Sequence, residues 1–472
     1  MINLFSFVTV LCIIKLFFIK KKEDKIKYLI PLVFFYESIL EIGYFFKIGN
    51  LEIGYLFCFN IFLFFYLSVA LLKSRISKKL FISGMILIGS VVLGDILLII
   101  FPTQLRTANI NISWDDKIVS PSLLFERIHL TSFNILNIFY LINYVMLFIL
   151  IISVFRKKFP QIVIQSLKKL TNVVLVIGVI EFVIKYIFKS NFFNIIVNSI
   201  FGVSKATYLE LTRRGDGVLL QGLSQESSHY VYLLFILFFL VLADYFLTKN
   251  RMCLYRLFLI IFLLAIAMSF SSLIYFLAII YILLLWRFRT VRFELKILIT
   301  LFQFLIIIFG SFLLAKLIPE MMANLDISGF WSRRIRSLFE EIQMMISGNW
   351  RYSSNSLEWS NRVRLVSIFE NLKIFVSRPI FGFGVGSVTS HGSTAMLLSG
   401  GGIISTLLWV KFNFLLERIK ISYEYVAVIL VFLLVNIFNS LSLRPFFDIS
   451  AIVFSSSMIV IFSLKEKKIE KV

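Results

Sequence analysis

Apolar runs long enough to cross a membrane recur along this chain of 472 residues. Each run has about 17–25 residues, which is enough for a helix to cross a hydrocarbon core of about 30 Å. Lipid offers no hydrogen-bond partners, so such runs must be helices that satisfy their own backbone groups. A hydrophobic content of 59% and a mean hydropathy of +0.93 exclude an ordinary soluble globular domain. We therefore expect a single multi-pass transmembrane domain over residues 1–472.

The runs predict an all-α integral membrane protein, a polytopic helical bundle of about 12–13 transmembrane helices. The first run lacks a basic start and a small-residue cleavage site, so we interpret it as a span and not as a signal peptide. The predicted spans are 2–19, 29–46, 53–72, 80–101, 133–155, 170–188, 230–248, 254–268, 272–286, 296–317, 396–410, 423–440 and 446–464.

Clusters of lysine and arginine fall in every second connection between these spans. By the positive-inside rule they lie in the cytoplasm, so the N-terminus is outside and the C-terminus is cytoplasmic. One long helix over 254–286 would break this alternation, so we predict two helices with a turn at Ser269–Ser272. The same clusters account for the net charge of +22 without a nucleic acid partner. They are Lys20–Lys27, Lys73–Lys79, Arg156–Lys169, Lys249–Arg256, Arg287–Lys296, Lys411–Lys420 and Lys465–Lys471.

Three long loops then face outward, at about 102–132, 189–229 and 318–395. In the last of these, helical spacing of apolar residues predicts an amphipathic surface helix around Trp331–Met345. A second helix is expected from Asn361 to Ser377. Its apolar stripe would be Leu365, Ile368, Leu372 and Phe375. A turn built from Pro379, Gly382, Gly384 and Gly386 should follow that helix.

The polar residues that could carry chemistry gather in the second and third loops. Arginine suits a diphosphate because its planar fork makes two charge-assisted hydrogen bonds and stays charged. The simpler interpretation is that such arginines contact lipid headgroups. The candidate arginines are Arg213, Arg214, Arg362, Arg364 and Arg378.

Two further candidates are His391 and Glu226, each close to the start of a span. Histidine suits proton removal from a hydroxyl because its unperturbed pKa is about 6.5. A carboxylate at the mouth of a span can orient a hydroxyl or pair with an arginine. The only adjacent carboxylates in the outer loops, Asp115 and Asp116, are interpreted as a solvated turn, so we predict neither a metal nor a cofactor.

The order and sidedness of these residues resemble the signature loop of the O-antigen ligase/polymerase superfamily. Members typically show an arginine, a helix, a Pro-x-x-Gly-x-Gly turn and a histidine just before a span. An earlier outer loop with Arg214, Gly215 and Glu226 is also similar to the family's. The chain departs from the pattern at Gly392 and Ser227, where members often have Asn and Pro, which leaves ligase and polymerase open. The matching positions in the signature loop are Arg364, Arg378–Gly386, His391 and Gly402.

The resemblance implies a GT-C-like glycosyltransferase of the bacterial cytoplasmic membrane. Its donor would be a polyprenyl-diphosphate-linked oligosaccharide at the outer face. His391 would be the base, Arg214 and Arg364 would hold the diphosphate, and Glu226 would support them. Further substrate contacts are expected from Arg213, Arg362, Arg378, Gly382 and Gly384.

We favour a polymerase of repeat units for an O-antigen or capsule, working beside a chain-length regulator and a flippase. The alternatives are a ligase that transfers the glycan to lipid A core or protein, and a transporter or flippase of polysaccharide intermediates. Transporters usually place ionisable residues at mid-membrane. Here the few that intrude on spans lie mostly near span ends: Lys15, Glu37, Glu41, Asp95, Glu181, Lys185 and Asp244.

Overall fold

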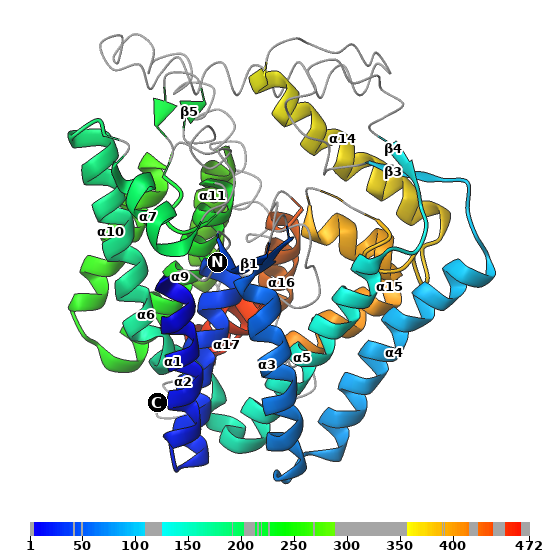
Figure 1. Cartoon of the computed structure of the whole chain (residues 1–472), viewed down its shortest axis with the longest axis horizontal. Helices are drawn as coiled ribbons and strands as arrows, with labels where there is room; N and C mark the ends of the chain where they lie inside the picture. The colour runs from blue at the N-terminus through cyan, green and yellow to red at the C-terminus, as the bar shows by residue number, and fades with distance from the viewer. Residues whose placement is uncertain are drawn as a thin grey trace.

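The computed structural model of the chain is mostly helical and contains three short hairpins (Figure 1). The class predicted from the sequence, an all-α membrane protein, agrees with it. The structure describes residues 4–40, 43–48, 51–108, 125–190, 192–202, 213–214, 217–218, 220–224, 227–267, 270–287, 356–388, 390, 392–414, 423–437 and 449–463.

In the first half of the chain, α3 packs against α5, α2 packs against α6, and α4 packs against α5. The helix α2 continues into a π-helical turn, η1, and α6 continues into a second one, η4. Their bounds are α1 Leu4–Phe18, α2 Lys22–Phe34, η1 Phe35–Ile39, α3 Tyr55–Leu72, α4 Lys78–Ile100, α5 Ser132–Phe155, α6 Phe159–Phe182 and η4 Val183–Ile187.

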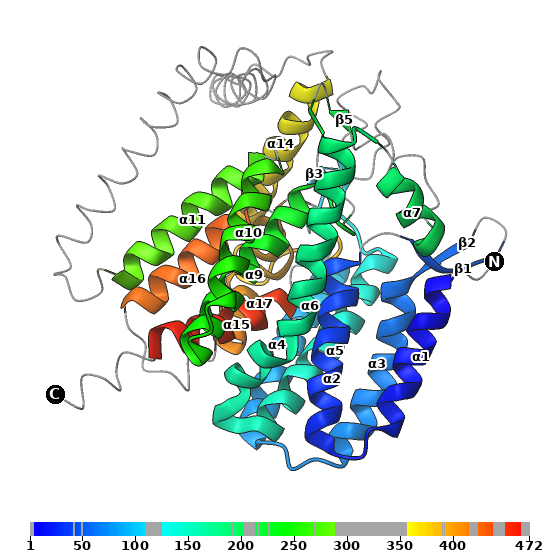
Figure 2. The ribbon, with the colours of Figure 1, turned by 90° about the vertical axis from the view of Figure 1, so that its left-hand side faces the viewer.

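In the second half, α10, α11 and α17 pack against α9, whereas α14 packs against α15 and α15 packs against α4. The bounds are α7 Phe192–Phe201, α9 Ser227–Thr248, α10 Met252–Ile266, α11 Phe270–Arg287, α14 Ser356–Ser377, α15 Ser393–Asn413, α16 Tyr423–Val435 and α17 Ile449–Ser463. The residues 230–241 of α9 are all buried, as expected for a helix that is apolar on every side. Figure 2 shows α11 and α16 lying side by side and oblique to α1–α3.

The antiparallel hairpins pair β1 (Tyr44–Ile48) with β2 (Leu51–Gly54), β3 (Arg106–Ala108) with β4 (Phe125–Arg127), and β5 (Arg213–Arg214) with β6 (Gly217–Val218).

Five helical stretches of the described residues are long and apolar enough to cross a membrane: Tyr55–Leu72, Lys78–Ile100, Ser132–Ile187, Ser227–Thr248 and Ser393–Asn413. The stretch Ser132–Ile187 holds two helices, because Arg156 at φ 48° and a 3-10 turn separate α5 from α6. Six shorter apolar helices accompany these stretches: Leu4–Phe18, Phe192–Phe201, Met252–Ile266, Ile274–Arg287, Glu424–Val435 and Ile449–Phe462. The predicted span 296–317 and the predicted surface helix Trp331–Met345 lie outside the described residues.

Two predicted boundaries differ from the structure. The span predicted at 29–46 begins at Lys22 and ends its helical part at Ile39, and residues 44–48 form a strand. Gly43 turns the chain at φ +91°, against the backbone of Phe201, where a side chain would clash. Residues 254–286 form two helices, as predicted, but α11 begins at Phe270, so part of the expected turn is helical.

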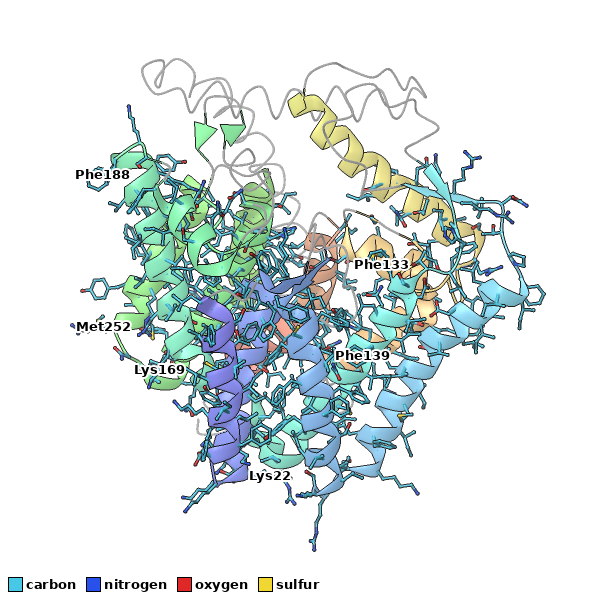
Figure 3. The ribbon with its side chains drawn as sticks, viewed as in Figure 1. Lys22, Phe133, Phe139, Lys169, Phe188 and Met252 are labelled. Carbon is cyan, nitrogen blue, oxygen red and sulfur yellow. The ribbon has the colours of Figure 1, made fainter. Side chains whose placement is uncertain are left out.

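The connections at the two ends of the helical bundle differ: basic ones lie toward one end and hairpins toward the other. The connections 20–27 and 73–79 lie toward one end of the bundle, where Lys22 is labelled (Figure 3). Lys22 Nζ donates a hydrogen bond to Ser74 Oγ and so links these two connections. The β3–β4 and β5–β6 hairpins and the far end of α14 lie at the opposite end (Figure 1). This grouping agrees with the charge pattern, and the compartment that each end faces stays a prediction.

Candidate functional site

The glycine-rich turn predicted after the loop helix is present. The helix α14 ends at Ser377, just before Pro379, which cannot donate a backbone hydrogen bond. Three glycines in the turn take positive φ values, 65° at Gly382, 88° at Gly384 and 106° at Gly386. Residues with a side chain rarely adopt this conformation, so the spacing of the glycines reflects a backbone requirement.

The turn packs into a break in the next helix. Within α15, Gly402 has φ 67° and ψ −177°, which interrupts the helical hydrogen bonds. Unpaired backbone groups inside a membrane cost several kcal/mol each, so a break survives only where other protein groups satisfy it. The turn supplies those groups through four backbone hydrogen bonds: Phe383 N to Ser399 O at 3.0 Å, Gly384 N to Gly400 O at 2.8 Å, Ile403 N to Pro379 O at 2.8 Å and Ile404 N to Ile380 O at 3.3 Å.

The close approach of the two backbones needs glycine on both sides. An added Cβ at Gly382 would clash with the backbone of Gly400, and one at Gly402 would clash with the carbonyl of Ile380. The glycines of the turn and of α15 therefore form one structural unit, which we call the turn–break unit (residues 379–388 and 399–404).

A buried polar cluster joins this unit to α4 and α5. Asn134 Nδ2 donates hydrogen bonds to Asp95 Oδ1 and to Ser387 Oγ, both at 2.8 Å. Thr131 and Asn134 form a capping box at the start of α5. Thr131 Oγ1 also donates to the carbonyl of Gly386 at 3.2 Å.

The sequence analysis noted Asp95 only as an ionisable residue within a span and missed Asn134 and Ser387. The available signal was the Thr131-x-x-Asn134 spacing at the start of an apolar run.

Arg378 links α14 to the end of α4. Its Nη2 donates a hydrogen bond to the carbonyl of Phe101 at 2.9 Å, and its guanidinium lies 4.6 Å from the ring centroid of Phe383. A cation at the C-terminal end of a helix is favoured by the helix dipole. Arg378, predicted as a substrate contact, therefore has a defined role in holding the turn.

The buried face of α14 differs from the predicted apolar stripe. Ser367, Ile368, Asn371 and Ile374 are buried, whereas Leu372 and Phe375 are half-buried. The buried face of α14 includes polar residues because it lies beside the break in α15. There, Asn371 Oδ1 accepts a hydrogen bond from Ser399 Oγ at 2.8 Å. A polar partner selects polar residues, so the buried face is shifted from the predicted apolar stripe and shares only Ile368 with it among the described side chains. The side chain of Leu365 lies outside the described residues.

The second loop that the charge pattern predicts to face outward is also held by a buried carboxylate. Glu181, near the end of α6, accepts hydrogen bonds from the backbone N–H groups of Gln221, at 3.0 Å, and Gly222, at 2.7 Å. It also pairs with Lys185 Nζ at 2.5 Å, and the exposed fractions of the two side chains are 0% and 2%. Gly222 has φ +60° and lies against the ring of Tyr230. The segment 220–224, which leads toward α9, is therefore fixed to α6.

The structure locates the other predicted site residues only in part. Arg213 and Arg214 form β5, and Arg362 and Arg364 lie in the first half of α14. Figure 1 shows β5 and this half of α14 at the same end of the molecule. The side chains of these four arginines, and the residues Glu226 and His391, lie outside the described residues, so their roles stay predictions.

Replacing Gly384 by alanine is expected to destabilise the protein by about 2–5 kcal/mol, from the left-handed backbone and the overpacking together. The new methyl group would meet Asp95 Oδ1 and lie 3.1 Å from Asn134 Nδ2, at φ +88°. Thermal unfolding in detergent measures the effect.

The matched control is Gly89→Ala in α4, where no atom lies within 4 Å of the added Cβ. That variant should be neutral or gain up to about 1 kcal/mol from helix propensity. Equal melting temperatures for the two variants would contradict the close packing at Gly384.

Among the residues that the structure describes, no group of three or more His, Cys, Asp or Glu side chains could hold a metal ion. Comparisons with family models, with curated proteins and with solved structures found no match for this chain. A functional interpretation therefore rests on the residues and their geometry.

Proposed function

We propose that this protein is a membrane glycosyltransferase that polymerises polyprenyl-diphosphate-linked oligosaccharide repeat units of a surface polysaccharide. The reaction takes place on the outer face of the cytoplasmic membrane. One observation carries the proposal: two of the matching positions on which the family resemblance rests, the turn Arg378–Gly386 and Gly402, pack against each other. Motif residues that meet in space are less easily explained by chance similarity than scattered matches.

In the proposed reaction, His391 takes the proton from the acceptor hydroxyl. The hydroxyl oxygen then attacks the anomeric carbon of the donor, and the bond from this carbon to the diphosphate oxygen breaks. Polyprenyl diphosphate leaves with the bonding electrons. Arg214 and Arg364 bind the diphosphate and stabilise the charge that develops on it, with Arg213 and Arg362 as further phosphate contacts.

Two features of the fold support this assignment. Both loops that carry the predicted residues are fixed to membrane helices by buried hydrogen bonds, one to Glu181 and one to Asn134. Catalytic groups need such support, because a misplacement of about 1 Å can cost about 100-fold in rate. Glu226 lies between the fixed segment 220–224 and the start of α9.

The direct test supplies the purified protein with lipid-linked repeat units and follows the products by size. A polymerase converts them into a ladder of longer lipid-linked chains. A ligase instead needs a separate acceptor, and a transporter moves the repeats without changing their length. In a deletion strain, loss of the enzyme should leave single repeats on the outer leaflet, whereas loss of a flippase would leave them on the inner leaflet.

Lysine at Arg214 or Arg364 is expected to leave little polymerase activity. An ammonium is a point charge and cannot reproduce the two parallel hydrogen bonds of a guanidinium to a phosphate. Polymer length and rate, at protein levels matched to wild type, measure the effect. The control is Lys373→Arg on the exposed face of α14, which should be silent because Lys373 pairs only with Glu370 on the surface. Full activity of both lysine variants would reduce Arg214 and Arg364 to headgroup contacts.

A further inference from the structure

Two buried carboxylates hold the two outer segments, and their hydrogen bonding differs. Glu181 has a cationic partner and two backbone N–H donors. Asp95 has an exposed fraction of 6%, and among the described residues it receives one hydrogen bond, from Asn134, while its Oδ2 has no partner. Among the described residues, Asp95 forms no ion pair. A buried carboxylate is costly in a membrane, so such a residue is expected to serve a function.

The backbone hydrogen bonds of the turn join it to α15, and among the described residues none of them reaches α4 or α5. The hydrogen bonds to those two helices come from side chains: Asp95 and Asn134 bind each other, Asn134 binds Ser387, and Thr131 binds the carbonyl of Gly386. The turn also packs closely on both helices, since an added Cβ at Gly94 would meet the carbonyl of Phe381 and one at Gly386 would meet the backbone of Asn134. Asp95 Oδ1 also occupies the space that a Cβ at Gly384 would need.

We propose that Asp95 and Asn134 are positioning residues of the polymerase reaction. They set the place of the turn between α4, α5 and α15, and through it the start of the segment that leads to His391. Asp95 lies against Gly384 and accepts a hydrogen bond from Asn134. Asn134 in turn donates a hydrogen bond to Ser387 and so links Asp95 to the turn. The expected changes in kcat rest on the proposed function, whereas the expected changes in hydrogen–deuterium exchange do not.

The test compares Asp95→Asn with Asp95→Ala. An amide keeps one oxygen of the same shape that can accept from Asn134 Nδ2, so Asp95→Asn should stay within about 3-fold of wild type. Asp95→Ala removes the acceptor, so kcat should fall by about 100-fold. Its KM for lipid-linked repeats should change little, since Asp95 does not touch the substrate.

Hydrogen–deuterium exchange of residues 382–388 supplies a readout that needs no enzymatic turnover. Exchange there should rise in Asp95→Ala and return to the wild-type level in Asp95→Asn. The matched control is Ser90→Ala, which removes the hydrogen bond between Ser90 Oγ and Ser405 Oγ, at 3.0 Å, between the same helices α4 and α15. It should change neither exchange at the turn nor kcat.

If Asp95→Ala fails to fold, Ser387→Ala tests the same chain of hydrogen bonds from its other end. It should raise exchange at the turn and lower kcat by about 10-fold, the order expected for one lost positioning contact. Failure of Asp95→Asn to restore both exchange and kcat would overturn the proposal, because an ionised group would then be required. Unchanged exchange in Asp95→Ala, or in Ser387→Ala, would overturn it too. Wild-type protein that makes no polymer would count against the proposed function, while exchange would still decide whether Asp95 holds the turn.

Discussion

Alanine in place of His391 is expected to lower the rate of polymer formation by about 10²–10⁴-fold, the usual contribution of a general base. The protein should still insert into the membrane and bind the lipid-linked donor, since the arginines proposed to hold the diphosphate remain. Glutamine should fail as well, because it forms hydrogen bonds but takes up no proton at neutral pH. Single-turnover rates on purified lipid-linked repeats measure the effect.

The control for this prediction is His129→Ala. His129 is exposed and its Nδ1 is hydrogen-bonded to the carbonyl of Arg127, 2.7 Å away, beside the β3–β4 hairpin. It does not match the position of the family's histidine, so its loss should be mild. A rate for His391→Ala within a few-fold of wild type would show that another group, such as Glu226 or solvent, takes the proton.

The membrane helices could be predicted from the sequence because lipid demands an unbroken apolar run. The prediction failed where an apolar run was not a helix. Residues 44–48 (YFFKI) have the aromatic and branched side chains of a strand as well as the hydropathy of a span. The chain forms a strand here because it turns at Gly43, whose backbone lies against that of Phe201. This contact could not be predicted because the two residues are far apart in the sequence.

Some features of the candidate site could likewise be predicted from the sequence, and others could not. Pro379 and the three glycines are local signals, so the end of α14 and the turn could be predicted. The break at Gly402 and its pairing with the turn could not, because helix propensity does not encode a tertiary hydrogen bond. Asn134 and Ser387 are 253 residues apart, and the capping-box spacing of Thr131 and Asn134 does not indicate that Asn134 binds Ser387. The hydrogen bond from Arg378 to a carbonyl at the end of α4 could not be predicted either, and the expected contact of Arg378 with substrate stays a prediction.

Loss of the Glu181 carboxylate should have the largest effect on stability in this molecule. Glu181→Leu removes the group that neutralises Lys185, and breaking a buried ion pair from one side costs about 3–5 kcal/mol. It also leaves the N–H groups of Gln221 and Gly222 without their acceptor, at about 1–3 kcal/mol each. We expect little folded protein in detergent, measured by the monodisperse fraction on size exclusion.

Two further variants separate the charge from the hydrogen bonds. Glu181→Gln keeps an acceptor for the two N–H groups but lacks the negative charge, so it should retain much of the ion-pair cost. Combining it with Lys185→Met removes both charges and keeps the acceptor, and replacing a buried pair in this way is often neutral or stabilising.

The surface control is Glu370→Gln in α14, whose pairing with the exposed Lys373 is worth about 0–1 kcal/mol. If Glu181→Leu melts at the temperature of Glu370→Gln, Glu181 does not hold the segment 220–224. If only the double variant recovers the folded fraction, the buried charge was the dominant cost. The two backbone N–H donors, at Gln221 and Gly222, then explain why a hydrogen-bond acceptor stands at this position.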